Sequence, residues 1–229
     1  MRNIILYFFC GLLFISCNHT NSDSERNNSN SNSKNNDFEK SYKKQLSDGD
    51  ITKEKIEYFD EETRLYSNFK YAVAYKETKN WMIDYGSGEY TIFRAYDADS
   101  GYTFSINVIE YAEDSKWGET DDIHTLMDSE ATINAYKEQN ISELTRYNMK
   151  PINYTFNKSY LKNFPAMKAT YKYIARQGDL EYEVQSLTYQ IQRARMMYTF
   201  SIQCPYMFYE TNPQYFEDIF LYVNFLLID

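Results

Sequence analysis

Histidine, cysteine, glycine and proline are all scarce in this chain of 229 residues, which has 2, 3, 7 and 4 of them respectively. The few glycines and prolines argue against a loop-dominated or low-complexity chain. The few histidines leave little material for general-base catalysis or for a metal site. No glycine-rich phosphate loop, serine elbow, obvious pair of catalytic carboxylates or internal repeat is visible, which lowers the expectation of an enzyme.

Basic residues are also outnumbered, with 24 lysines and arginines against 33 aspartates and glutamates. The formal net charge of −9 repels nucleic acid, so we expect no nucleic-acid partner. Aromatic residues are abundant instead, at 18% of the chain with 24 tyrosines and 15 phenylalanines. That much aromatic surface can build a core and excludes global disorder.

The first 16 residues are predicted to be a signal peptide. Arg2 precedes an apolar run from Ile4 to Ile15, which is shorter than the ~20 residues that a membrane-spanning helix needs. The run ends in Leu13-Phe-Ile-Ser-Cys17, which resembles the bacterial lipobox. That resemblance implies cleavage before Cys17 and a lipid (diacylglycerol, palmitate) on its thiol. The alternative is an ordinary secretory signal with an incidental cysteine.

An acylated Cys17 defines where the chain resides and what its other cysteines can do. Two or three acyl chains give an effectively permanent anchor, so we expect a lipid-anchored protein of the bacterial cell envelope, outside the cytoplasm. Asn18 rather than aspartate follows the anchor, which by resemblance to enterobacterial lipoproteins favours the outer membrane. Cys10 would be removed with the signal, so Cys204 remains alone and no intramolecular disulfide can form.

A polar tether is predicted from residue 17 to residue 62, ahead of a single domain at 63–229. Residues 18–36 contain no apolar side chain, so they cannot repay the entropy of ordering. Residues 37–62 stay charged with sparse apolar side chains, and we expect at most a frayed helix near 52–59.

The domain is predicted to be α+β, with an antiparallel sheet flanked by helices. Period-two alternation predicts strands at 69–75, 81–85, 90–96, 102–111, 152–156, 166–176, 180–193 and 196–204. One or two helices are expected over 121–147, capped by Asp121 or Asp128. A closing helix follows Asn212 and Pro213, with Phe216, Ile219, Phe220 and Val223 as its apolar stripe.

The strand predicted at 180–193 changes its apolar phase. Tyr182 and Val184 alternate one way, whereas Leu187, Tyr189 and Ile191 alternate the other. This pattern indicates either a bulge near residues 185–186 or a strand buried on both faces.

This arrangement resembles the PsbP-like proteins, an α/β/α sandwich family that includes an extrinsic protein of photosystem II and many bacterial lipoproteins. The resemblance rests on the strand leading from Tyr71 to Trp81, on Pro165-Ala166 at the start of a long strand, and on Phe216…Ile219…Phe225 at the close. It extends from Tyr66 to Asp229. The family has no shared active site, so the resemblance implies an accessory or docking protein and mainly a fold.

Three residues are candidates for binding a partner. Trp117 lies in an acidic loop beside Gly118 and is a plausible contact for protein or sugar, the alternative being a lid over the sheet edge. Arg193 and Arg195 lie at a hairpin tip of an otherwise acidic protein, where they either contact an acidic partner or are simply solvated.

Other residue patterns are more simply explained by structure than by chemistry. His124 is expected at a helix start, Cys204 inside the core, and residues 97–101 in a hairpin turn rather than a calcium loop. One strand face carries Lys168, Thr170, Lys172, Ile174 and Arg176. It can hold an anion, or it is a sheet surface that is solvated or faces a helix, and Arg176 is expected opposite Glu181. No catalytic residue, cofactor or metal is predicted.

The sequence therefore predicts a non-catalytic binding or accessory module for another envelope protein. One alternative is a small-ligand carrier with an aromatic-lined pocket between sheet and helix. A further alternative is a hydrolase with dispersed acidic residues.

Overall fold

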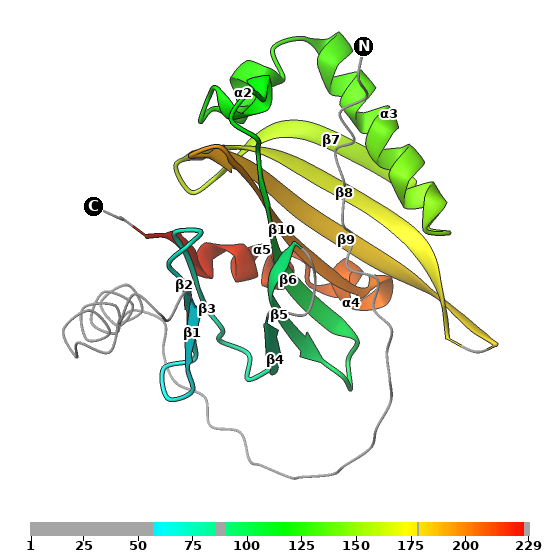
Figure 1. Cartoon of the computed structure of the whole chain (residues 1–229). Helices are drawn as coiled ribbons and strands as arrows, with labels where there is room; N and C mark the ends of the chain where they lie inside the picture. The colour runs from blue at the N-terminus through cyan, green and yellow to red at the C-terminus, as the bar shows by residue number, and fades with distance from the viewer. Residues whose placement is uncertain (1–56, 86–89, 178, 227–229) are drawn as a thin grey trace. The chain divides into compact units, whose positions relative to one another are not determined.

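The computed structural model describes residues 57–85, 90–177 and 179–226, and Figure 1 draws the others in grey. The predicted signal peptide, Cys17 and the tether up to residue 56 lie outside the described residues. The described residues form two compact units, one comprising 79–222 and the other comprising 57–78 and 223–226. The prediction of a single domain at 63–229 stays a prediction.

An antiparallel sheet of seven strands dominates the larger unit (Figure 1). Its strands, in spatial order, are β4 (Met82–Tyr85), β5 (Thr91–Asp97), β6 (Tyr102–Glu110), β10 (Met196–Pro205), β9 (Leu180–Arg193), β8 (Phe164–Gln177) and β7 (Ile152–Leu161). Each lies within or around a segment of period-two alternation. The predicted strands from residue 81 onward are therefore confirmed.

Helices cover both faces of this sheet. The segments η1 (Lys116–Gly118), α2 (Ile123–Leu126) and α3 (Glu130–Arg146) precede β7, and the segments α4 (Tyr206–Thr211), α5 (Pro213–Ile219) and η2 (Phe220–Tyr222) follow β10. Tyr136 of α3 stacks on Phe156 of β7, with ring centroids 5.3 Å apart, whereas Phe220 of η2 packs 4.9 Å from the ring of Tyr189. Phe156 pairs with Ala169, and Tyr189 pairs with the neighbouring residue Lys168. Because successive side chains of a strand point to opposite faces, the two helical layers lie on opposite sides. The predicted α+β class is confirmed.

Strand β9 is buried on both faces from Val184 to Gln192 and contains no bulge. Its register with β8 and with β10 runs unbroken through residues 185–186, so the first explanation for the phase change is wrong and the second is correct. One face carries Leu187, Tyr189 and Ile191, and the other carries Ser186, Thr188, Gln190 and Gln192, all of them buried. The apolar pattern changes because polar side chains occupy buried positions on the face toward α3.

The helices at 121–147 start one residue later than the sequence suggested. Asp122 accepts a hydrogen bond from the His124 amide at 2.8 Å and caps α2, and Ser129 accepts one from the Thr132 amide at 3.2 Å and caps α3. Asp121 and Asp128 were the wrong choices. Asp121 accepts instead from the amide of Ala194, at 2.6 Å, so a tertiary contact that local sequence does not reveal competed for its carboxylate.

The closing helix is confirmed. Asn212 accepts a hydrogen bond from the Tyr215 amide at 3.2 Å, and Pro213 takes the first helical position. Phe216, Ile219, Phe220 and Val223 of the predicted stripe are at most 3% exposed. The stripe is wrong at Val223, however, because α5 ends at Ile219 and Val223 begins strand β11, where it pairs with Tyr75 of β3. The short helix α4 ahead of it was not predicted, because its six residues show no apolar periodicity.

The smaller unit is a four-stranded antiparallel sheet. Its order is β1 (Glu57–Asp60), β2 (Leu65–Asn68), β3 (Val73–Lys76) and β11 (Val223–Phe225). Two predictions need correction here. Residues 57–60 form a strand rather than tether or frayed helix, because they pair with β2. The strand predicted at 69–75 is interrupted, since Ala72 turns the chain with a φ of +49°.

Candidate functional site

The loop that carries Trp117 is packed onto the larger unit. Trp117 is partly buried against the apolar cluster beneath α2 and α3, and its ring lies 6.0 Å from that of Tyr136. The geometry matches the alternative of a lid over the sheet. A binding role for Trp117 stays a prediction.

Arg195 holds that same loop in place. Its guanidinium donates to the backbone carbonyl of Gly118 at 3.3 Å and to that of Ala112. A Cβ atom added at Gly118 would lie 2.8 Å from the Cζ atom of Arg195, so the guanidinium rests directly on the glycine. Arg195 therefore binds the backbone of the loop that carries Trp117, and its role in the structure is to hold that loop in place.

Arg193 lies away from this loop contact. Its guanidinium carbon is 5.8 Å from the centre of the Phe164 ring, a cation–π arrangement. The two arginines therefore contact different neighbours, and a binding role for Arg193 stays a prediction.

His124 makes contacts within the fold, and Cys204 is buried in it. The Nε2 atom of His124 lies 2.9 Å from the backbone carbonyl oxygen of Ala166, and its ring packs edge-on against Tyr160 at 5.1 Å. Cys204 is 1% exposed, and burial raises the pKa of its thiol to about 12. A neutral buried thiol is a poor nucleophile.

Residues 97–101 form the hairpin turn between β5 and β6. The carboxylate of Asp97 accepts hydrogen bonds from the Asp99 and Ser100 amides, at 3.1 and 3.4 Å, and from the Ser100 hydroxyl at 2.6 Å. Gly101 closes the turn with a φ of +72°. Among the described residues, no group of three or more histidine, cysteine, aspartate or glutamate side chains is placed to hold a metal ion.

The cationic strand face of β8 is neutralised along its length. Lys168 pairs with Glu217 of α5, and Lys172 lies 3.4 Å from Glu183. Arg176 pairs with Glu181 across the hairpin at 2.6 Å, as predicted. Lys168 and Lys172 face helices, through Glu217 of α5 and the ring of Tyr206 of α4, whereas Arg176 is solvated, with 77% of its side chain exposed.

The end of the β8–β9 hairpin is a feature that the sequence analysis missed. The β7 ladder stops at the pair Ile152–Lys172 and the β10 ladder stops at Pro205–Val184. Beyond those pairs the two strands of the hairpin pair in the described ladders only with each other, and Figure 1 shows the hairpin extending past the rest of its sheet.

Large apolar side chains are exposed on both faces of this end and on the nearby helix α4. We define the hairpin end by six exposed residues from the hairpin, α4 and the start of β7: Ile152, Ile174, Leu180, Tyr182, Met207 and Phe208. Leu180 and Met207 are the most exposed, at 72% and 66%. The signal in the sequence is Leu180, an apolar residue immediately after the Gly178-Asp179 turn.

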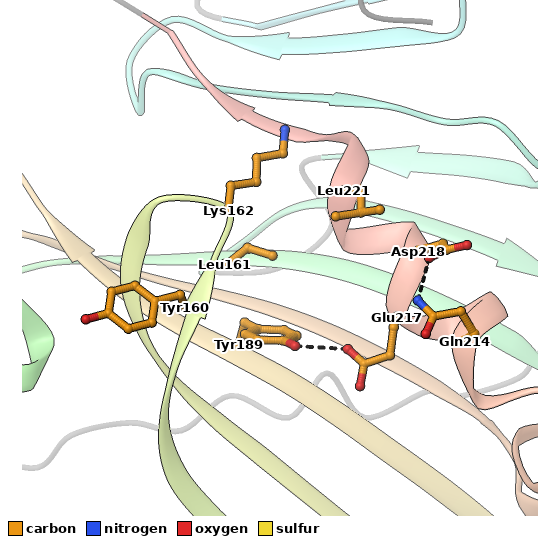
Figure 2. A pocket seen from close by; sticks show the side chains of 8 residues that line it. All are labelled: Tyr160, Leu161, Lys162, Tyr189, Gln214, Glu217, Asp218 and Leu221. Carbon is orange, nitrogen blue, oxygen red and sulfur yellow. Dashed lines mark hydrogen bonds between the residues drawn. The ribbon is translucent and has the colours of Figure 1, made fainter. Parts of the chain in front are cut away.

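A pocket lies between the turn that joins β7 to β8, strand β9 and α5 (Figure 2). Its volume is about 320 Å³. The lining residues are Tyr160, Leu161, Lys162, Tyr189, Gln214, Glu217, Asp218 and Leu221. Its position between sheet and helix is the one expected for a small-ligand carrier.

The polar groups of this pocket are ordered by one another. The Tyr189 hydroxyl donates to Glu217 at 2.9 Å, and the Gln214 amide donates to Asp218 at 2.7 Å. Burial, and then the neighbouring Glu217 carboxylate, raise the pKa of Tyr189 above its usual value, which keeps it a hydrogen-bond donor. Surrounding protein partly shields the exposed Lys162 ammonium and lowers its pKa.

None of the helices in the described part of the chain combines the length and apolar character needed to span a membrane. No family model matches this chain. No curated protein matches it either.

Solved structures of similar fold do exist. The solution structure of cyanobacterial PsbP (CyanoP) from Synechocystis sp. PCC 6803 covers 70% of this chain and 91% of its own, with 12% identity and a TM-score of 0.48. A crystal structure from Bacteroides thetaiotaomicron VPI-5482 covers 68% of this chain, with 10% identity and a TM-score of 0.42. The chain spans 46% of that second protein. These likenesses concern the fold alone.

Proposed function

We propose that this protein is an envelope lipoprotein, anchored through acylated Cys17, that acts as a non-catalytic binding or accessory module for another envelope protein. The Leu13–Cys17 motif supports the anchor and the extracytoplasmic location. The observation that carries the binding role is the hairpin end.

Three properties of the hairpin end suit a protein partner. It exposes Leu180 and Tyr182 on one face of the hairpin, and exposed apolar side chains of this size are typical of interaction surfaces. It includes exposed Tyr182 and Met207, and tyrosine and methionine are enriched at interfaces. Its two strands also extend beyond the ends of their pairing with β7 and β10, so a partner can approach them from either edge.

Charge on this surface is compatible with a partner of either sign. Arg176 and Lys172 are each paired with a glutamate of β9, so the cations near the hairpin end are already matched. Apolar contact rather than charge attraction is then the main source of affinity. We expect binding that changes little with salt.

A pull-down from detergent-solubilised envelope tests this role. The full chain is compared with the double variant Leu180→Asp/Tyr182→Asp and with the matched control Met82→Asp, since Met82 is also exposed, at 57%, but lies on β4. We expect the same partner with the full chain and the control, and loss of it with the double variant. Equal recovery with all three would contradict a role for the hairpin end.

The anchor has its own test. Cys17→Ala is expected to abolish labelling by radioactive palmitate and to release the protein from the membrane fraction. Palmitate labelling that persists in this variant would refute the anchor.

The pocket favours a second candidate function, that of a small-ligand carrier. Its volume of about 320 Å³ lies at the lower end of the roughly 300–1,000 Å³ that is usual for small-molecule sites. A thermal-shift screen of metabolites on protein purified without a partner tests this candidate. A ligand that raises the melting temperature would favour it, and a screen without any such ligand would count against it.

A further inference from the structure

The floor and the walls of the pocket differ in chemistry. Leu161 and Tyr189 form the floor and are 5% and 7% exposed, and the half-exposed Leu221 adds an apolar edge. The walls are polar, with Lys162 on the β7–β8 turn and Gln214, Glu217 and Asp218 on α5. Figure 2 shows the Tyr160 ring directed away from the other lining side chains, so the aromatic surface inside is that of Tyr189. A ligand must therefore present carbon on one side and hydrogen-bonding groups on the others.

The formal charges around the pocket cancel. Glu217 is paired with Lys168, and the remaining charged groups of the lining are one ammonium, on Lys162, and one carboxylate, on Asp218. A site with no net charge gives neither an anion nor a cation a large electrostatic advantage. We therefore expect an uncharged ligand.

The hydrogen-bonding capacity of the walls suits hydroxyl groups. The Glu217 carboxylate is held by Tyr189 on one oxygen and by Lys168 on the other. Each carboxylate oxygen has more than one acceptor site, so Glu217 can accept further hydrogen bonds without moving. The carboxylate of Asp218, held by Gln214, is a second acceptor, and the Lys162 ammonium and the Gln214 amide supply donors. Hydroxyl groups both donate and accept, which matches this mixture.

We propose that this pocket binds a small neutral ligand rich in hydroxyl groups, of the size of one sugar ring. The apolar floor would contact the C–H face of the ring, and the walls would bind its hydroxyl groups. This site is separate from the hairpin end and from the partner proposed for it.

Ligand-observed NMR on the full chain in detergent tests the proposal. The neutral probes are glucose and N-acetylglucosamine, and the charged probes of similar size are glucuronate and glucosamine. A neutral probe is expected to bind with a Kd on the order of millimolar, the range typical of such small ligands. The charged probes are expected to bind at least about tenfold more weakly, because a charged group loses hydration on entering a lining whose charges of both signs give it no net attraction.

Three variants locate the binding. Leu221→Trp fills the pocket from an exposed position and is expected to abolish binding while leaving the melting temperature unchanged. Glu217→Gln and Asp218→Asn are each expected to weaken binding by at least about fivefold, because a charged acceptor is replaced by a neutral one. Leu180→Ser, at the hairpin end, is the matched control and should bind as the parent does.

Two results would overturn the proposal. One is the absence of binding by both neutral probes, and the other is binding that survives Leu221→Trp or prefers a charged probe. Asp218→Asn decides the matter if Glu217→Gln proves unstable. Since the pull-down depends on Leu180 and Tyr182 and sugar binding depends on Leu221 and Asp218, each proposal can fail without the other.

Discussion

The two ends of strand β9 differ in how they contact the rest of the protein. At its C-terminal end the turn into β10 is fixed, because Asp121 accepts from Ala194 and the Arg195 guanidinium holds two carbonyls of the Trp117 loop. At its N-terminal end the hairpin leaves the sheet and exposes Leu180 and Tyr182. One end therefore serves stability, whereas the other exposes apolar surface that stability does not require. Such surface is what a binding module would present to a partner.

The largest loss of stability is expected between the two ends, where β9 meets the closing helix. Phe220 is fully buried against Tyr189 and Phe104. Phe220→Asp removes that packing and buries a charge, so we expect it to destabilise the larger unit by more than about 4 kcal/mol. Chemical denaturation measures the loss, and an unaltered midpoint would contradict the assignment of the closing helix.

Local sequence patterns predicted most of the secondary structure of the larger unit. The closing helix is specified by Asn212, Pro213 and a regular apolar stripe, all of which are short-range signals. The caps at Asp122 and Ser129 were misplaced by one residue because several polar residues compete there and Asp121 is recruited by a distant turn. Strand β1 was missed because its pairing with β2 is a tertiary property of a sparse, charged segment.

The candidate sites were predicted less well from the sequence than the secondary structure was. Trp117 and Arg195 were chosen because aromatic and basic residues in loops are often exposed. Trp117 instead packs on an apolar cluster, and Arg195 binds the backbone of the Trp117 loop. The hairpin end depends on where the neighbouring strands stop, and strand length relative to neighbours cannot be read from alternation. The pocket joins residues about 60 positions apart, Lys162 and Leu221, which only the fold brings together.

A smaller loss is expected at the fixed end. Arg195→Ala removes two hydrogen bonds from a charged donor and should cost about 2 kcal/mol. Arg193→Ala is the matched control and should cost less than about 1 kcal/mol, because it loses a cation–π contact. If both variants have the stability of the parent, the docking of the Trp117 loop does not stabilise this end.

A pH effect comes from Cys204, a buried residue of strand β10. Its folded pKa of about 12 lies above the ordinary thiol pKa of 9.0, so the unfolded chain loses its proton first as the pH rises. The contribution of Cys204 to stability is therefore complete below pH 9 and declines between pH 9 and 12. From pH 9 to pH 10 this amounts to about 1 kcal/mol.

Comparison with Cys204→Ala isolates this effect from that of the tyrosines. The parent should lose more stability than the variant between pH 9 and pH 10. Equal slopes of stability against pH in the two proteins would show that the thiol is not held neutral by burial. Slow alkylation of Cys204 in the folded protein is the expected companion result.

The smallest effect is expected at the hairpin end. Leu180→Ser changes a side chain that is 72% exposed, so the free energy of unfolding should stay within about 0.5 kcal/mol of the parent. The same variant should weaken partner recovery in the pull-down. A large loss of stability would mean that the hairpin end belongs to the folding core and would remove the contrast between the two ends.

The most direct test places a photo-activated cross-linking amino acid at residue 180 or at residue 193 of the full chain in living cells. If the hairpin end is the contact surface, residue 180 gives a discrete cross-linked species and residue 193, near the fixed end, gives none. Equal cross-linking from both positions, or a species from residue 193 alone, would contradict the account.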